Sequence, residues 1–531
     1  MQNTASLKKE LSFFDLVIIG VVGAIGTGIL FSTAGMTGIA GPGSILSWLI
    51  GGIFYLFIGL TYVELSTLHP EAGGPSRYSL YTHGRMTNLI NAFSDLLWYI
   101  FIPPIEALAV VEGISVFVKG LLLPSGDPTL LGAMLGVMLM LVFIPFNYFG
   151  VKAFGRSTVA IGIVKLVLYL AVAIGLVFVF FDARNLTAYH GFLPLGLPGV
   201  FLAIPLAMFA FGGIRVLPDY AEEAANRKKL PTAIILVVIG QLLIYLLYDF
   251  VFVTGINWGS LGIKSRGNWA AVGQIVGNPF IAMANSYHAG WLLTLTLIIG
   301  IIGPFVVGYI YLGGGSRVLF AMGRSGIASR SVKGIHHTYS IPYVSLFALA
   351  VVGAMVTFVA APLPNIYGLI TDSVVAGYIG FSANPVAMTV SRRQGVTTSR
   401  IPLGGAVAPV AFIAASLIVY WSGWLYVSYS VLLLLVGVVI FAIAYKVKEN
   451  VMNSLWYMAY IAWLLAMTYI GSTGAPDILH LHLTTLLNFY QSSLVVVIVS
   501  LLVFYPWGVL SGLSRKYDVP QYTTDVLGSP D

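Results

Sequence analysis

The sequence contains no cysteine and very little charge. The lack of cysteine excludes disulfide bonds and thiol chemistry. Only 8% of the residues are charged and 58% are hydrophobic, whereas soluble domains carry about 25% charged residues. No polar stretch between the hydrophobic runs exceeds the length of a long loop, so the sequence offers no separate soluble domain. These absences predict an integral membrane protein along the whole chain.

The hydrophobic runs have the length of membrane helices. Each is about 20 residues long, whereas the strands of a membrane barrel alternate over about ten residues. We therefore predict an all-α integral membrane protein with fourteen spans, at approximately 14–38, 43–66, 87–118, 129–149, 157–181, 198–226, 232–255, 286–322, 342–361, 364–390, 404–422, 424–446, 453–472 and 485–510. The run 286–322 is taken as one long helix, because cutting it would reverse the side of every later basic loop.

Basic residues gather on one side of this predicted topology. About 20 of the 26 Lys and Arg residues fall on the side of the N-terminus, and the other side holds Lys119, Arg184, Lys264 and Arg266. Cytoplasmic loops are enriched in such residues. We therefore expect a multi-pass protein of the plasma membrane with both termini in the cytoplasm. The net charge of +7 then sets the topology in the lipid bilayer and is no indication of a nucleic acid partner.

Two spans are interrupted near the middle of the membrane. The interrupting residues are Gly20, Gly23, Gly26 and Gly28 in the first span and Gly212, Gly213 and Pro218 in the sixth. In hydrocarbon a broken helix is tolerated only where it lines a cavity, since every backbone polar group must be paired. Breaks at corresponding positions of two five-span halves are typical of secondary transporters with an inverted repeat. The alternative is that glycine and proline are simply common in membrane helices.

Several motifs occur in a fixed order along the chain. They are DLVIIGVVGAIGTGIL at 15–30, AGPG at 40–43, YVELS at 62–66, PEAGGPSRY at 70–78, NYFGVKAFGR at 147–156, FAFGG at 209–213, AEEAANRKKLP at 221–231 and GSRVLFAMGRSG at 315–326. This ordered set resembles the permeases of the amino acid–polyamine–organocation (APC) superfamily. The resemblance implies the leucine-transporter fold, a 5+5 inverted repeat. We expect a ten-helix transport core at 1–395, helices 11 and 12 at 396–450, and helices 13 and 14 with a cytoplasmic tail at 451–531.

The first break offers groups that suit an amino acid. The half-helix after the break presents unpaired N–H groups at its positive dipole end, which favour a carboxylate. The resemblance implies that Thr27, through its N–H and hydroxyl, and the N–H of Gly28 bind the carboxylate, with Gly26 in the break itself. The carbonyl of Ile25 would accept a hydrogen bond from the ammonium group. Alternatively, Thr27 only bonds back to its own helix, as threonines in membrane helices commonly do.

The second break is expected to complete the substrate site. The carbonyls near Phe209 and Gly212, beside Gly213, would add acceptors for the ammonium group. The resemblance also implies that the aromatic ring of Phe209 covers the bound substrate. Since aromatic residues make up 13% of the chain, packing is the ordinary alternative for such a ring.

Lys165 is a basic residue that lies deep within a predicted span. It follows Arg156 by nine residues, which places it about 14 Å deep in a hydrocarbon core about 30 Å thick. An ionisable residue at that depth is a functional hypothesis by default. The resemblance implies that it occupies the place of sodium in sodium-driven relatives, so we predict that Lys165 carries the coupled proton. The alternative is a structural lysine that only fixes the carbonyls of the first break.

Arg215 and several acids also fall within predicted spans. We place Arg215 in the substrate site, where it would favour substrates with acidic or neutral side chains. The alternative is that it pairs with Asp219 or Glu106. Glu106, which follows Pro103 and Pro104, is also a candidate relay, and the other acids within predicted spans are Asp95, Glu112, Asp249 and Asp372. Glu222 and Glu223 are expected to form a gate or topology ion pair beside Arg227. The histidines show no metal-binding spacing, and we expect no metal and no cofactor.

Together these patterns predict a secondary active transporter rather than an enzyme. Paired catalytic acids, a nucleophile elbow and a phosphate-binding loop are all missing from the sequence. The expected partners are a small amino acid substrate, protons and lipid. Proton-coupled uptake by alternating access is the first hypothesis, and amino acid exchange is the second. A proton-translocating subunit of a respiratory complex is the alternative of another class, although the sequence shows no row of lysines in its spans.

Overall fold

The computed structural model describes residues 6–275, 277–286, 289–361, 374–397, 400–471 and 486–517. Within these residues the regular structure is helical, apart from two isolated bridges, Leu11 with Ala224 and Leu122 with Pro128. The first helix begins at a capping box, in which Ser12 Oγ accepts from Asp15 N and the Asp15 carboxylate accepts from Ser12 N. This box satisfies two backbone donors that the first turn would otherwise leave unpaired.

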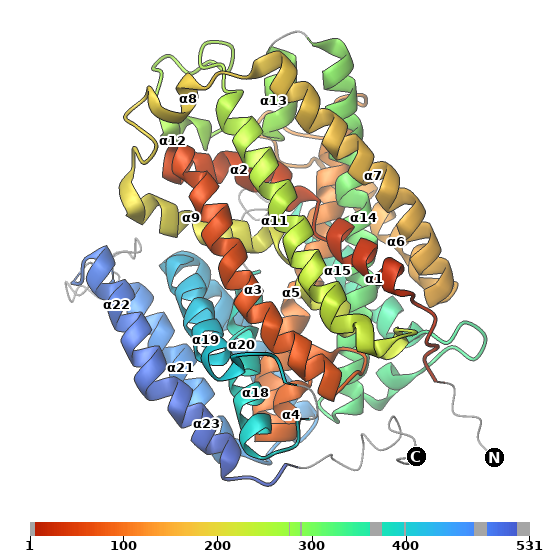
Figure 1. The fold of residues 1–531 in the computed structure, drawn as a ribbon. Coiled ribbons are helices and arrows are strands. Elements are labelled where there is room, and N and C mark those ends of the chain that lie inside the picture. Colours follow the sequence, from red (N-terminus) through yellow and green to blue (C-terminus); the bar gives the residue numbers. More distant parts are fainter. Residues whose placement is uncertain are drawn as a thin grey trace.

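The membrane helices run in both directions through one bundle (Figure 1). They are α1 (Phe13–Val22), α2 (Thr27–Ala40), α3 (Ser44–Leu68), α5 (Arg85–Ser115), α6 (Leu130–Tyr148), α7 (Val151–Phe180), α9 (Gly196–Ala210), α10 (Gly213–Asp219), α11 (Leu230–Thr254), α14 (Gly290–Arg324), α15 (Tyr343–Ala360), α17 (Val375–Gly380), α18 (Ala383–Arg393), α19 (Gly404–Trp421), α20 (Trp424–Ala444), α21 (Val451–Ile470), α22 (Phe489–Val499) and α23 (Tyr505–Leu513). Shorter helices lie between them: α4 (Tyr78–His83), α8 (Arg184–Thr187), α12 (Trp269–Val272) and α13 (Pro279–Ser286).

The predicted all-α membrane fold is confirmed. In the described part of the chain, 12 helical stretches are long and apolar enough to cross a membrane, and the first of them, Phe13–Leu68, contains α1, α2 and α3. The run predicted at 286–322 is one helix, α14, of 35 residues. The span predicted at 364–390 begins outside the described residues, together with Asp372, and continues as α17 and α18.

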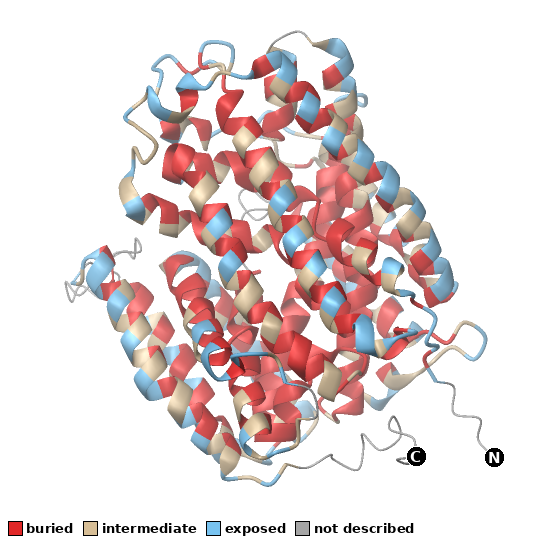
Figure 2. Cartoon of the chain, in the orientation of Figure 1, coloured by how far each residue is buried: buried red, intermediate tan, exposed pale blue. Residues whose placement is uncertain are grey.

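Burial separates the core helices from those that face lipid. Residues of α5 and α1 are mostly buried, whereas the outer faces of α7 and α22 are exposed (Figure 2). The exposed positions are apolar, for example Phe178 on α7 and Leu502 after α22. Such surfaces suit a hydrocarbon solvent. The buried centre is built on α14, which packs against α5 along its length and also against α6, α7 and α15.

Buried ion pairs close the bundle on the side of the N-terminus. Glu222 accepts from Arg324 at 2.6 Å, and Glu223 accepts from Arg317 at 2.8 Å. Both arginines lie near the end of α14. Both acids are therefore ion-paired, but with α14, since the neighbouring Arg227 guanidinium donates to the Glu222 backbone carbonyl. These pairs fix the segment after α10 against α14.

The C-terminal end of the described chain docks on the same side. The hydroxyl of Tyr517 and Nε2 of His69 share a hydrogen bond, and the His69 ring stacks on Tyr81 with centroids 3.9 Å apart. Tyr81 in turn donates to Glu71 at 2.7 Å. The contact ties the residues after α23 to the loop between α3 and α4.

Titration of His69, which lies in this contact, makes the stability of the folded protein dependent on pH. Burial, with a smaller contribution from the positive charge of Arg77, lowers the pKa of His69 to about 3, against about 6.5 in an unfolded chain. Because the folded value is depressed, the stability that neutral His69 contributes is complete above pH 6.5 and is lost as the pH falls from 6.5 toward 3. From pH 7 to pH 5 the expected loss is about 2 kcal/mol.

Melting of the purified chain at pH 7 and pH 5 measures this loss. His69→Gln should reduce the difference, while the slope contributed by His83, whose pKa burial lowers to about 4, remains in both proteins. Equal pH slopes for wild type and variant would show that His69 titrates normally.

Candidate functional site

The first span breaks between α1 and α2, at Gly23–Gly26. The backbone N–H of Thr27, at the start of α2, donates to Glu106 Oε2 at 3.2 Å, and the Thr27 hydroxyl donates to Glu106 Oε1. A Cβ at Gly26 would lie 2.9 Å from Glu106 Oε2, so this carboxylate approaches the break more closely than a side chain there would allow. A carboxylate therefore occupies the positive end of α2, where the sequence predicts the carboxylate of a substrate.

Glu106 reaches this place from the kinked middle of α5. It follows Pro103 and Pro104, which lie inside that helix, and its side chain is buried. Sequence reasoning offered Glu106 as a proton relay or as a partner of Arg215 and missed its contact with Thr27. Its depth in the membrane was visible in the sequence, but the rotation of α5 that points it at the break was not.

The sixth span breaks between α9 and α10, at Phe211 and Gly212. In the first turn of the new half-helix, the backbone N–H of Ile214 donates to the hydroxyl of Tyr55. Phe211 packs against the rings of Tyr55 and Tyr245, each with a centroid separation of 4.9 Å. The second break is therefore surrounded by aromatic side chains of α3 and α11, and Phe211 belongs to that packing.

The two breaks lie against each other. A Cβ at Gly28 would lie 2.6 Å from the Cα of Ala210, so only glycine allows α2 to start this close to the end of α9. The hydroxyl of Tyr245 is 2.8 Å from the carbonyl oxygen of Ala24 and 2.7 Å from that of Ala210. One side chain of α11 thus contacts the freed carbonyls of both breaks.

Lys165 contacts the first break from α7. Its ammonium donates to the carbonyl of Val22 at 2.8 Å and to that of Gly303 on α14 at 3.0 Å, and the side chain is fully buried. Val22 is the last residue of α1, so the ammonium lies at the negative end of that half-helix. Lys165 and Glu106 are also close enough to interact electrostatically. The break is therefore flanked by one basic and one acidic side chain.

The structure brings together most of the residues that the sequence predicts for the site. The backbone of the first break and the start of α2 lie beside the second break, with Lys165 on the opposite side of the first break. The predicted residues that are buried there are Ile25, Gly26, Thr27, Gly28, Gly212 and Gly213. Phe209 is half-buried near the end of α9 and is the most accessible of the predicted set. Thr27 does not bond back to its own helix, because its hydroxyl donates to Glu106.

Arg215 is paired, but with a partner that the sequence did not suggest. Its guanidinium donates to Asp95 on α5 and to the carbonyl of Gly377 on α17. The predicted pairing with Asp219 or Glu106 is wrong: Asp219 accepts from the hydroxyl of Tyr99 instead. The guanidinium also lies 4.1 Å from the ring centroid of Phe381. Arg215 therefore joins α10 to α5 and to the tenth span.

Removing one member of this buried pair is expected to be costly. Arg215→Met leaves the Asp95 carboxylate buried without its counter-ion, which destabilises a protein by about 3–5 kcal/mol. Arg215→Met combined with Asp95→Leu replaces the pair by apolar groups and should recover most of that loss. Melting of the single and double variants in detergent measures the effect. Single variants as stable as wild type would show that the pair contributes nothing to the fold.

Comparison with known proteins identifies the family of this chain. The family model described as amino acid permease matches residues 11–470. The chain belongs to the amino acid permease family. The resemblance to APC permeases is thereby confirmed, and this permease is a membrane transporter. The alternative of a respiratory proton-translocating subunit is not supported.

Relatives align with the permease over nearly its whole length. The aspartate-proton symporter of Bacillus subtilis is 30% identical, covering 97% of this chain and 99% of its own. The glutamate/serine transporter AimA of the same organism is 27% identical, covering 96% and 95%. The branched-chain amino acid permease BcaP, also from Bacillus subtilis, is 25% identical over 84% of this chain. The names of these three relatives give different substrates.

Proposed function

We propose that this permease takes up an amino acid together with a proton by alternating access. The observation that supports this most is the pair of facing breaks, with Lys165 at the end of α1 and Glu106 at the start of α2. Half-helix ends at mid-membrane bind the charged groups of small substrates in secondary transporters. The backbone groups of Ile25, Gly26, Thr27 and Gly28, with Phe209, Gly212 and Gly213, form the proposed site.

Glu106 provides a physical basis for coupling proton binding to substrate binding. Its carboxylate holds the Thr27 N–H and hydroxyl, which the carboxylate of an amino acid would need. Two carboxylates at one half-helix end repel each other, so binding of the substrate favours a proton on the site. Lys165, near Glu106, is the second group that can hold or release that proton. Substrate and proton then enter together because neither is well accommodated alone.

Acidic amino acids are the first substrates to test. Two relatives are named for aspartate and for glutamate and serine. In this chain Arg215 is a buried cation already bound to a carboxylate, Asp95, next to the second break. We propose that an acidic substrate side chain interacts with this cation when the transporter is loaded.

The proposed orientation has both termini in the cytoplasm of a cell whose plasma membrane holds the permease. The support is the excess of Lys and Arg in the loops on the side of the N-terminus. The ion pairs of Glu222 and Glu223 then close the cytoplasmic side. In this arrangement the substrate is released after these pairs separate.

Uptake into proteoliposomes tests the proposal. The purified chain is reconstituted alone, and accumulation of labelled aspartate is measured with an inward proton gradient, with the gradient collapsed by a protonophore, and in empty liposomes. Accumulation that requires the gradient supports proton-coupled uptake. Uptake that instead requires an amino acid inside the vesicles would establish exchange. If neither condition gives uptake of aspartate, glutamate, serine or any other amino acid, the proposed function is wrong.

A further inference from the structure

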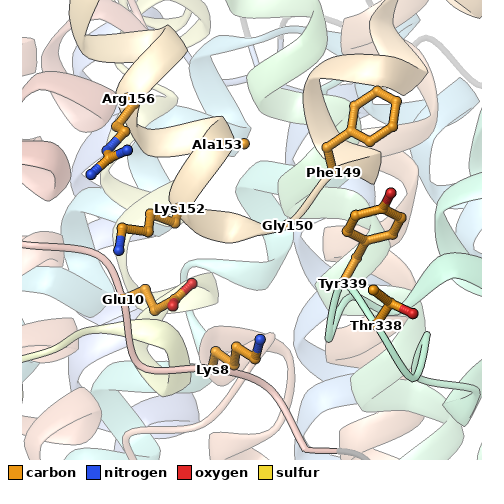
Figure 3. Close-up of a pocket in the computed structure, with 9 residues that line it drawn as sticks. All are labelled: Lys8, Glu10, Phe149, Gly150, Lys152, Ala153, Arg156, Thr338 and Tyr339. Atoms are coloured by element: carbon orange, nitrogen blue, oxygen red, sulfur yellow. The ribbon is translucent and has the colours of Figure 1, made fainter.

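A second candidate binding site lies outside the transport core, at the turn between α6 and α7. A cavity of about 300 Å³ opens there on the side of the N-terminus. It is lined by the N-terminal segment before α1, by the first turns of α7 and by the loop between α14 and α15 (Figure 3). A volume of this size is at the lower end of small-molecule sites and suits a headgroup rather than a large ligand.

The walls of this cavity differ in chemistry. Lys8, Glu10, Lys152 and Arg156 lie along one wall, whereas Phe149, Thr338 and Tyr339 lie along the other (Figure 3). The three basic side chains are exposed, and none forms an ion pair with another described residue. Glu10 opposes them with a single negative charge. Three cations and one carboxylate leave the cavity a net charge of +2 by this count.

The start of α7 adds to the attraction for an anion. This helix of 30 residues begins after Gly150 with no side-chain cap, so its first backbone N–H groups have no partner of that kind. Gly150 has φ of +96°, which glycine adopts without strain and which turns the chain sharply into the helix. The uncapped start of α7 and the side chains of Lys152 and Arg156 therefore border the same cavity as Lys8 (Figure 3).

The position of the cavity favours a lipid over a free anion. Apolar side chains of α6 and α7 are exposed farther along these helices, including Leu141 at 53% exposed and Ile163 at 44% exposed. Phe149, which lines the cavity, is itself 54% exposed. Aromatic residues at this level are common where membrane helices enter the headgroup region. A molecule with an anionic head and acyl chains would fill the cavity and cover the exposed faces together.

We propose that this cavity binds the headgroup of an anionic phospholipid. The phosphate lies among Lys8, Lys152, Arg156 and the first N–H groups of α7, and hydroxyl groups of the headgroup reach Thr338 and Tyr339. The site also has a mechanical consequence. Leu11, three residues after Lys8, bonds through its backbone to Glu223 and Ala225 beyond α10, at 3.0 and 2.8 Å. A lipid that joins Lys8 to α7 therefore holds the N-terminal segment in its present, closed position.

Binding of phosphatidylglycerol to the purified full chain tests this site. A fluorescent, short-chain form is titrated into the protein in a neutral detergent, in parallel with phosphatidylcholine and with inorganic phosphate. Lys8→Gln combined with Lys152→Gln removes two charges and keeps both side chains polar and unbranched up to Cδ. Its matched control is Lys446→Gln combined with Lys448→Gln, two exposed lysines after α20. The first double variant should bind phosphatidylglycerol on the order of tenfold more weakly than the control.

Each comparison has an outcome that overturns the proposal. Equal affinity of the two double variants would place the lipid elsewhere. Phosphatidylcholine binding as tightly as phosphatidylglycerol would show that the anionic head is not recognised, and phosphate that displaces the probe at the same concentration as the lipid would establish a free-anion site. If the double variant does not give a monodisperse protein, Arg156→Gln alone provides the same comparison. Transport is not needed for this measurement, so it stands apart from the proposed uptake.

Discussion

Lys165→Ala is expected to abolish accumulation of the amino acid driven by a proton gradient while leaving exchange across the membrane measurable. The buried ammonium donates to the Val22 carbonyl at the end of α1, and the proposed cycle requires it to change protonation there. Alanine cannot carry a proton. Accumulation in proteoliposomes should therefore fall to the level of empty liposomes, and counterflow of labelled against unlabelled substrate should persist.

The Lys165 experiment needs a control for lost packing. Removing the ammonium leaves the carbonyls of Val22 and Gly303 without their donor, at a cost of about 1–3 kcal/mol each. Lys165→Gln retains a hydrogen-bond donor without the charge, so it separates proton transfer from structure. Lys264→Gln, an exposed residue, serves as the unrelated lysine control. Gradient-driven accumulation that survives unchanged in Lys165→Ala would make Lys165 a structural residue.

Glu106→Gln is expected to remove most of the pH dependence of substrate binding. Glutamine is a permanent stand-in for the protonated acid, so the substrate carboxylate no longer meets a competing charge at Thr27. Because juxtaposed like charges cost several kcal/mol, binding near pH 7.5 should become at least about tenfold tighter. Net uptake should fall, since release of the substrate depends on the return of the Glu106 charge. Tryptophan fluorescence titrations between pH 5.5 and 8 measure the affinity.

Glu112→Gln is the matched control for Glu106→Gln. Glu112 lies on the same helix, α5, and its carboxylate accepts from the backbone N–H of Asn278 at 2.9 Å, away from the two breaks. Its substitution should leave the pH dependence of binding intact. A Glu106→Gln variant whose affinity varies with pH as in wild type would contradict the proposed competition at α2.

Single-helix properties could be predicted from the sequence. The length of the apolar runs predicted most described spans to within a few residues, although α7 begins at Val151 rather than 157 and α10 ends at Asp219 rather than 226. The continuity of α14 followed from the sidedness of the basic loops. The glycines of the first and sixth spans predicted both breaks, because a broken membrane helix has few sites where its backbone can be accommodated. Lys165 could be placed at the level of the first break from its distance to Arg156 alone.

Contacts between helices could not be predicted in the same way. Arg215 binds Asp95, although a nearer charge in the sequence suggested Asp219, and Glu222 binds Arg324 rather than the neighbouring Arg227. The hydrophobic pattern gives the depth of a side chain but not the rotation of its helix, because a core helix of this bundle is apolar all around. The contact of Glu106 with Thr27 was missed for the same reason: it depends on how α5 turns after its two prolines.

The hydroxyl of Tyr245 has one hydrogen, yet it lies within bonding distance of two carbonyls that belong to different broken helices. It can donate its hydrogen to only one of these carbonyls at a time, so rotation of the hydroxyl selects between the two. The Ala24 carbonyl also accepts from the N–H of Gly26 at 3.1 Å, so the Ala210 carbonyl is the one that we expect to offer its lone pair to the ammonium group of a substrate when Tyr245 turns away. The choice of acceptor by the Tyr245 hydroxyl therefore links the two halves of the fold through a single hydrogen atom.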